Sequence, residues 1–217
     1  MTTPPDSAPP GPFTSLKQLA RQAAANAEER CELCGEAIGA EHQHLLDIST
    51  RELQCVCRAC ALLFDRPAAG AGMRRLVPRR SRYMVDFDLN DALWEGLRIP
   101  VNMAFFSDNS AAGRVLALYP GPMGPTESLL TLEAWQDLEQ RNPILKDMEQ
   151  DVEALLVNRV RDARDHFLVP IDECYKLVGI IRLHWKGLSG GRDVWREIDA
   201  FFADLKARAR PVGGRDA

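Results

Sequence analysis

The sequence predicts an α+β protein in which a small treble-clef or rubredoxin-like metal-binding module is followed by an α+β domain. The first observation is that residues 31–64 contain five of the six cysteines of the chain. The second is that short apolar runs of strand type and longer amphipathic runs of helix type follow one another from about residue 83. The chain has 217 residues, of which 46% are hydrophobic, so it can bury one domain core and carry a small module.

The composition of the chain indicates which classes of partner and which cellular compartment to expect. The formal net charge is −4, so no global basic signal indicates nucleic acid or an anionic membrane as a partner. No apolar run approaches the roughly 18 residues that span a bilayer, and the N-terminus lacks the basic start and apolar core of a secretory signal. We therefore expect a cytoplasmic protein, in which closely spaced cysteines indicate metal or redox chemistry before disulfides.

The segment before the cysteines divides into a tail and a helix. Residues 1–14 contain five prolines and are expected to form a disordered tail. Residues 15–30 are rich in alanine, with Leu16 and Leu19 at helical spacing and Ser15 as a candidate cap. We expect this helix to lead into the cysteine-rich module, and the two together to extend over residues 15–66.

Two short cysteine motifs carry the predicted metal site. Cys31 and Cys34 are separated by two residues and followed by Gly35, which can adopt the positive φ of a metal-binding knuckle. Cys57 and Cys60 repeat the same spacing. Four thiolates from two such knuckles form a closed tetrahedral site for zinc, or for iron in a rubredoxin-like site.

The residues between and after the knuckles predict the module's fold. The runs HLLDI and ELQCVC flank residues 49–51 and are expected to form a hairpin. The run ACALLF after the second knuckle is expected to begin a helix. A knuckle, a hairpin and a cysteine pair at a helix start, in this order, are typical of a treble clef.

Three further residues could bind the ion or lie beside it: His42, His44 and Cys55. Period two on a strand places Cys55 on the same face as Cys57, so Cys55 could replace Cys57 as a ligand or lie next to the ligands. Either histidine could also be a ligand or lie on the hairpin surface. Five cysteines could hold an iron–sulfur cluster, although their spacing matches no ferredoxin run.

A nuclease of the HNH type also uses such knuckles around a hairpin that carries histidine. The hairpin here offers no Asp-His pair, and no Asn and His follow at the helix that begins near Cys60. The catalytic ion of such a nuclease would therefore lack its ligands. The sequence disfavours this activity.

Residues 67–82 are predicted to form a basic linker between the module and the second domain. We expect its arginines to be solvated or paired with acidic neighbours, since a few basic residues in an acidic chain only weakly indicate nucleic-acid binding. These arginines are Arg74, Arg75, Arg79, Arg80 and Arg82.

Residues 83–210 are predicted to form the α+β domain, with a tail at 211–217. Residues 97–108 and 113–122 look like paired strands, and the Pro/Gly-rich run YPGPMGPTES that follows is expected to be a shaped loop. In the helix predicted within residues 129–145, three apolar side chains share one face: Leu132, Trp135 and Leu138.

The C-terminal half of this domain ends in two predicted helices. Residues 151–160 are ambiguous between strand and helix, and the apolar run after them ends where Pro170 and Asp172 mark a helix start. The last helix, DVWREIDAFFADLKARAR, is amphipathic, and these side chains are expected to face inward: Val194, Ile198, Phe201 and Leu205.

No set of residues indicates catalysis. Cys174 lacks a histidine placed as its base and is interpreted as a buried small residue. His166 beside Asp165 could be a general base, but it is interpreted as a surface residue, which is the commoner case. We therefore assign no catalytic residue, and the sequence disfavours an enzyme without excluding one.

Several runs together resemble a bacterial protein family whose genes lie beside those of uptake NiFe-hydrogenases. These runs are CELCG, HQHLLD, RELQCVCRACALLF, YPGPMGPTES and VPIDECYKLVGIIRLHWKGLSGG. The resemblance implies an accessory or maturation role, with a hydrogenase subunit or maturation factor as the partner. It assigns no activity and does not distinguish zinc from iron. Two functions follow: a zinc-binding accessory or assembly protein, or a rubredoxin-like iron protein that transfers electrons for the hydrogenase.

Overall fold

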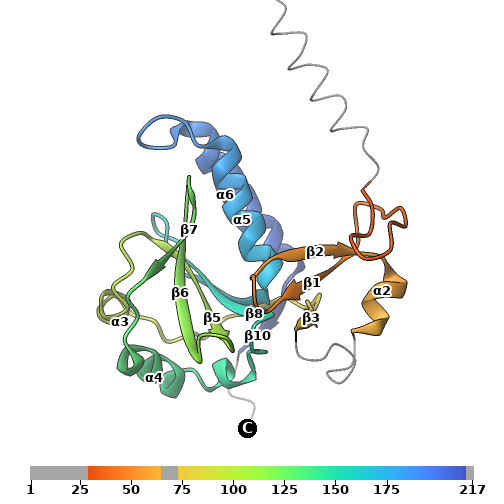
Figure 1. The fold of residues 1–217 in the computed structure, drawn as a ribbon. Helices are drawn as coiled ribbons and strands as arrows, with labels where there is room; N and C mark the ends of the chain where they lie inside the picture. Colours follow the sequence, from red (N-terminus) through yellow and green to blue (C-terminus); the bar gives the residue numbers. More distant parts are fainter. Residues whose placement is uncertain (1–28, 65–72, 214–217) are drawn as a thin grey trace, which may run out of the picture.

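The computed structural model describes residues 29–64 and 73–213 (Figure 1). The predicted tail at 1–14 and the predicted helix, up to residue 28, lie outside the described residues. Among the described residues, the strands form a three-stranded sheet of order β2-β1-β3 and a seven-stranded sheet of order β10-β4-β9-β8-β5-β6-β7. Helices accompany both sheets, which confirms the predicted α+β class.

The three-stranded sheet belongs to the cysteine-rich part of the chain. Strand β1 (Gln43–Asp47) pairs antiparallel with β2 (Leu53–Val56), and helix α2 (Arg58–Leu63) follows at once. The predicted hairpin and helix are thus confirmed. The other edge of β1 pairs antiparallel with β3 (Arg74–Leu76), a strand formed within the segment that was expected to be a linker.

The seven-stranded sheet is antiparallel except where β10 runs parallel to β4. Its strands are β4 (Arg82–Met84), β5 (Met103–Asn109), β6 (Arg114–Gly121), β7 (Gly124–Ser128), β8 (Glu153–Asn158), β9 (Asp165–Pro170) and β10 (Arg210–Val212). Its helices are α3 (Asp91–Gly96), α4 (Leu132–Arg141), the 3-10 helix η1 (Pro143–Asp147), α5 (Ile171–His184) and α6 (Gly191–Arg208). In the described residues, no helix is both long and apolar enough to cross a bilayer.

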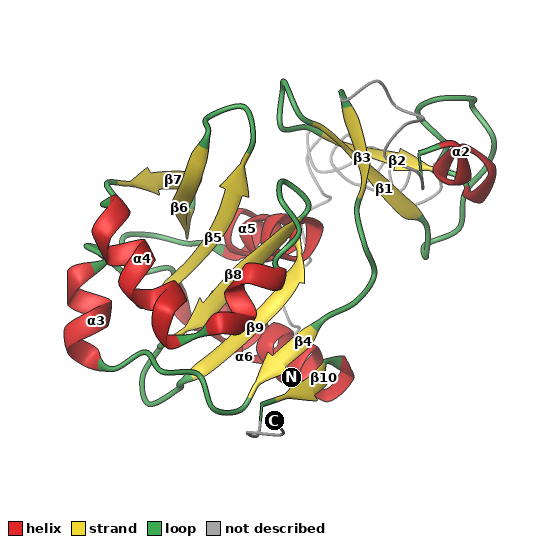
Figure 2. Ribbon diagram, turned by 90° about the horizontal axis from the view of Figure 1, so that it is seen from below, coloured by secondary structure: helices red, strands yellow, loops and turns green. Residues whose placement is uncertain are grey.

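Helices cover both faces of this sheet. Helices α5 and α6 lie on one face, and α3, α4 and η1 lie on the other (Figure 2). Neighbouring residues alternate between the two cores, as Phe105 and Phe106 do on β5. Every residue of β8 is buried, so the ambiguous run at 151–160 is a central strand whose two faces are both covered.

Two predicted features differ from the structure. Leu132 is 65% exposed, since it is the first residue of α4, and only Trp135 and Leu138 are buried on the predicted face. The run YPGPMGPTES is a strand pair and not a loop, because Gly121 on β6 pairs with Gly124 on β7 across a tight turn. The φ of 122° at Gly124 explains why a glycine stands there.

The β1–β2 hairpin packs between two cores. Leu46 belongs to the core beneath α5 and α6, and Leu53 packs against it. Leu45 and Val56, which point to the opposite face of the hairpin, belong to a small core around the cysteines. Period two along the strands therefore gives the hairpin one face toward the cysteines and one toward α5.

Arginines from the predicted linker pair with acidic residues, as expected. Arg80 and Arg82 both contact Glu153, whose side chain is fully buried on β8. Arg80 also pairs with Glu149, and Arg75 donates to the backbone oxygen of Gln150. These contacts hold the three-stranded sheet and β4 against the β8 region of the larger sheet.

Candidate metal centres

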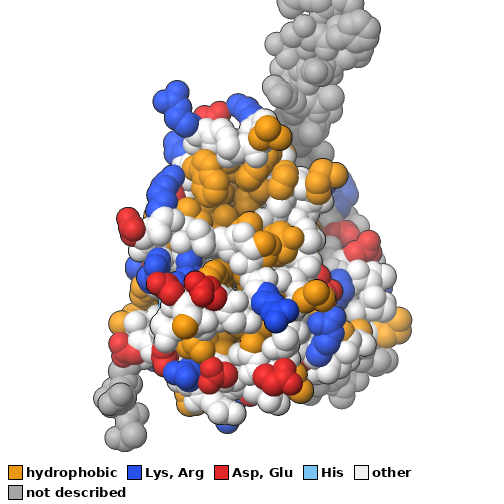
Figure 3. Space-filling model, turned by 90° about the vertical axis from the view of Figure 1, so that its left-hand side faces the viewer, with side chains coloured by type: hydrophobic (Ala, Val, Ile, Leu, Met, Phe, Trp, Pro, Cys, Tyr) orange, Lys and Arg blue, Asp and Glu red, His pale blue; other side chains and the backbone are white. Residues whose placement is uncertain are grey.

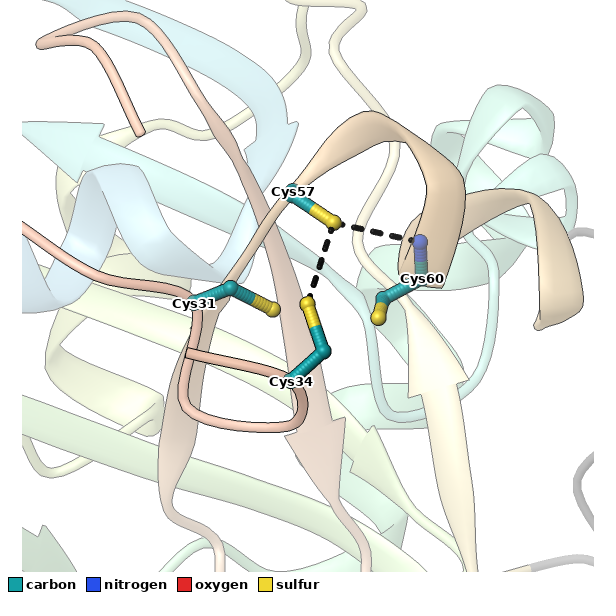
Figure 4. Close-up of side chains that lie close together, drawn as sticks. All are labelled: Cys31, Cys34, Cys57 and Cys60. Carbon is teal, nitrogen blue, oxygen red and sulfur yellow. Dashed lines mark hydrogen bonds between the residues drawn. The ribbon is translucent and has the colours of Figure 1, made fainter. Parts of the chain in front are cut away.

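The four knuckle cysteines converge at one end of the hairpin (Figure 4). Cys31 and Cys34 lie on a tight turn, in which Gly35 has a φ of 77° and donates to the backbone oxygen of Cys31. Cys57 is the N-cap of α2, and its sulfur accepts a hydrogen bond from the backbone N–H of Cys60 at 3.4 Å. The structure therefore brings together all four predicted ligands.

The sulfur positions fit a metal–thiolate site. The four Sγ atoms lie within 4.8 Å of one another, and Cys34 Sγ lies 3.7 Å from Cys57 Sγ. In a tetrahedral site with metal–sulfur bonds of about 2.3 Å, neighbouring sulfurs are about 3.8 Å apart. The cluster could thus bind a metal ion without large movement of the backbone.

The electrostatics of the cluster explain why an ion would stabilise it. Burial raises the pKa of Cys31, but backbone N–H groups of Cys57, Cys34 and Leu33 outweigh it and lower the pKa to about 6. The pKa of Cys60 is raised to about 12, first by its hydrogen bond with Cys34 and then by burial. Four adjacent thiolates repel one another, so full ionisation requires a cation among them.

The other three candidates form a second cluster. Ligand atoms of His42, His44 and Cys55 lie within 4.8 Å of one another. His44 and Cys55 are cross-strand partners, and His42 precedes His44 by two residues, so all three share the hairpin face that turns toward α5. Cys55 is thus grouped with the two histidines, whereas Cys57, which follows the end of β2, joins the other cysteines.

Asp172 is the residue at this cluster that sequence reasoning missed. The sequence placed it at the start of α5 as a residue that could cap the helix, but the N-cap position is Pro170 and has no side-chain cap bond. Asp172 Oδ2 lies instead 2.7 Å from His44 Nδ1, a partner 128 residues away. The acidic residue in the first turn of α5 was visible in the sequence, but nothing local indicated its partner.

The C-terminal candidates Cys174 and His166 belong to neither cluster. Cys174 is completely buried, and burial raises the pKa of its thiol, as expected for a small core residue. The interpretation of His166 as a surface residue was wrong: it is 5% exposed and stacks on Phe87. Burial, followed by the nearby charge of Arg159, lowers the pKa of His166 to about 4.

Comparison with known proteins identifies a family for this chain, but the description of that family gives no activity. A family model described as "Family of unknown function (DUF5947)" matches residues 30–209. No curated protein and no solved structure matches the chain. The matched region contains both clusters and Asp172.

Proposed function

The chain belongs to the DUF5947 family, whose description assigns no activity, and we propose from its site that it is a zinc-binding accessory protein that acts by binding another protein. The proposed ligands of the ion are Cys31, Cys34, Cys57 and Cys60. One observation carries the proposal: four cysteines from two knuckles converge, and four thiolates are enough to fill the tetrahedral coordination sphere of an ion. A closed site stabilises a fold and leaves no coordination position for a substrate.

The small core around the cysteines supports a structural role for the ion. Its buried members are Cys31, Leu45, Val56, Cys60 and Ala61. So few apolar side chains supply little hydrophobic stabilisation, and two of them are themselves proposed ligands. In such modules the free energy of metal binding contributes directly to folding.

We propose a hydrogenase subunit or a hydrogenase maturation factor as the partner, in the cytoplasm. The resemblance of the sequence motifs supports this partner. Exposed apolar side chains on the larger α+β part could form its docking surface, and Figure 3 shows a face on which apolar side chains gather. Among the described residues, the large hydrophobic side chains with the greatest exposure are Met123, Leu129, Leu183 and Leu188.

Affinity purification tests this function. Full-length protein carrying a tag that binds no metal is purified under argon from cells that express the hydrogenase genes. The proposal expects a colourless protein that contains zinc and co-purifies with a hydrogenase subunit or maturation factor. Deletion of the gene should lower hydrogenase maturation without changing the activity of enzyme already assembled.

The redox alternative gives a different result in the same experiment. Iron held by four thiolates absorbs strongly in the visible when it is ferric, whereas zinc does not. A coloured protein that exchanges electrons through bound iron, with maturation unchanged by the deletion, would replace the accessory role with electron transfer.

A further inference from the structure

We propose that His42, His44 and Cys55 form a second metal site, separate from the four cysteines and oriented by Asp172. The three side chains lie on the hairpin face opposite to Leu45 and Val56, which pack around the four cysteines. The four-cysteine ion would then lie at one end of the hairpin, and the second ion on the face that turns toward α5. The inference does not depend on the proposed protein partner.

The contact between His44 and Asp172 prepares the histidine to bind a metal. His44 Nδ1 lies 2.7 Å from Asp172 Oδ2, and an ionised carboxylate can only accept a hydrogen bond. The hydrogen then resides on Nδ1, and in the neutral ring this leaves the lone pair of Nε2 free. Metal-bound histidines have this arrangement, because a carboxylate on the other nitrogen fixes the tautomer and the ring orientation.

His42 shows the same preparation with a different partner. Its Nδ1 lies 2.9 Å from the backbone oxygen of Gly39 and 3.4 Å from a carboxylate oxygen of Glu29, and both oxygens accept. The hydrogen is again placed on Nδ1. Nε2 is left buried with no hydrogen-bond partner, on a side chain that is 10% exposed.

An unsatisfied buried nitrogen needs an explanation, since leaving such a group without a partner costs about 1–3 kcal/mol. A metal ion accepts the lone pair of His42 Nε2 and removes this cost. Asp172 Oδ1 is a second buried atom without a hydrogen-bond partner at the same place. Two unsatisfied polar atoms beside three metal-binding side chains indicate a ligand, and not only a packing arrangement.

Cys55 completes the donor set through the register of the hairpin. It lies directly across from His44, so their side chains project from the same face at adjacent positions. The backbone N–H of Cys55 donates to Glu32 Oε1 at 2.7 Å, and the Glu32 N–H donates back to the Cys55 oxygen. These bonds fix the strand that carries the thiol.

The donor set indicates the class of ion and the form of the site. Two imidazoles and one thiolate suit a borderline-soft divalent transition metal such as zinc or cobalt. Three protein ligands leave one coordination position for water or an external donor group. His42, His44 and Asp172 line a cleft of about 650 Å³ between the hairpin and α5, which gives that position room. The four-cysteine cluster has no such vacancy in its ligand set.

A cobalt titration of the full-length protein tests the second site. The protein, with a tag that binds no metal, is titrated with Co²⁺ under argon in the presence of a non-thiol reductant. We expect wild type to bind two ions with different visible spectra, one typical of four thiolates and one of mixed nitrogen and sulfur ligands. His44→Ala and Cys55→Ser should each bind one ion and keep the four-thiolate spectrum.

His184→Ala is the matched control, because His184 lies at the end of α5 and outside the cluster. It should bind two ions like wild type. The persistence of the four-thiolate spectrum in His44→Ala and Cys55→Ser shows that the module remains folded. If wild type binds a single ion, or if both variants still bind two, the second site is ruled out.

Asp172→Asn tests the positioning role without removing a ligand. The amide can still accept a hydrogen bond from His44 but carries no charge, so the affinity for the second ion should fall by about 10- to 100-fold. The first ion and the melting temperature of the metal-free protein should not change. An unchanged affinity for the second ion would rule out Asp172 as its positioning residue.

Discussion

Cys34 Sγ and Cys57 Sγ lie 3.7 Å apart, although 23 residues separate them in the chain. This contact joins the turn before β1 to the start of α2, and it is close to the sulfur separation of a metal–thiolate tetrahedron. An ion at this point would connect the two ends of the module more strongly than its small apolar core does. The first prediction follows from this contact.

Cys34→Ser should release the ion and unfold the module. A neutral hydroxyl is a poor ligand for zinc, and the remaining core cannot hold the two knuckles together. Hydrogen exchange should show loss of protection over residues 29–64 and loss of the four-cysteine zinc, and an ion bound by His42, His44 and Cys55 on the same hairpin should be lost with it. Cys55→Ser is the control, since it should leave the four-cysteine ion in place. Retained protection in Cys34→Ser would contradict a structural role for this ion.

Metal removal should also weaken the larger part of the protein. Leu46 packs into the core of α5 and α6, so an unfolded hairpin exposes apolar surface on both sides. A chelator should therefore lower the melting temperature of the whole chain, and zinc should restore it. At a free zinc concentration 100 times the dissociation constant, the stabilisation is about 2.7 kcal/mol. A melting temperature that does not depend on zinc would show that the larger domain unfolds independently of the cysteine-rich module.

Glu153→Gln should destabilise the protein strongly. Glu153 is fully buried and accepts from Arg80 at 3.0 Å and Arg82 at 3.1 Å, so its loss of charge leaves two arginines without their main partner. Arg80 is 53% exposed and Arg82 is 16% exposed, so solvent screens part of each contact, and the loss of these charged hydrogen bonds should cost about 1.5–3 kcal/mol, which chemical denaturation can measure. The exposed pair of Arg114 and Glu127 provides the control, because Glu127→Gln should cost at most about 1 kcal/mol. Equal effects would show that burial does not decide the strength of the pair.

Stability should fall as the pH falls from 7 to 4, and His166 should cause part of the fall. Its pKa is about 4 in the folded protein, against 6.5 for an unperturbed histidine, so the unfolded chain binds the proton more readily. The contribution of neutral His166 is therefore complete above pH 6.5 and is lost as the pH approaches 4. Denaturation curves of wild type and His166→Phe across this range should show a weaker pH dependence in the variant. Parallel curves would contradict the role of His166.

The sequence was most informative where a local pattern decides the structure. The spacing of Cys31, Cys34, Cys57 and Cys60 predicted one cluster, and apolar runs with turn residues predicted the hairpin, α2, and the pairing of β5 with β6. These features depend on neighbouring residues, so periodicity and turn chemistry are enough to find them.

The remaining features depend on contacts between distant segments. Nothing near His44 indicates Asp172, and nothing near Arg74 indicates that β3 pairs with β1. The assignment of His42, His44 and Cys55 to a separate cluster required knowing that β2 ends at Val56 and that one hairpin face meets α5. His166 was misjudged because burial on β9 depends on Phe87, a residue from another part of the chain.

The central claim is that four cysteines bind a zinc ion that stabilises the fold of the cysteine-rich module. Elemental analysis of full-length Cys55→Ser, purified anaerobically with a tag that binds no metal, tests it most directly, because this variant should lack the second ion. The account predicts one zinc and no iron per chain, lost when Cys34→Ser is added. A folded protein without metal would contradict the claim, and one iron in place of zinc would contradict the zinc assignment and favour electron transfer.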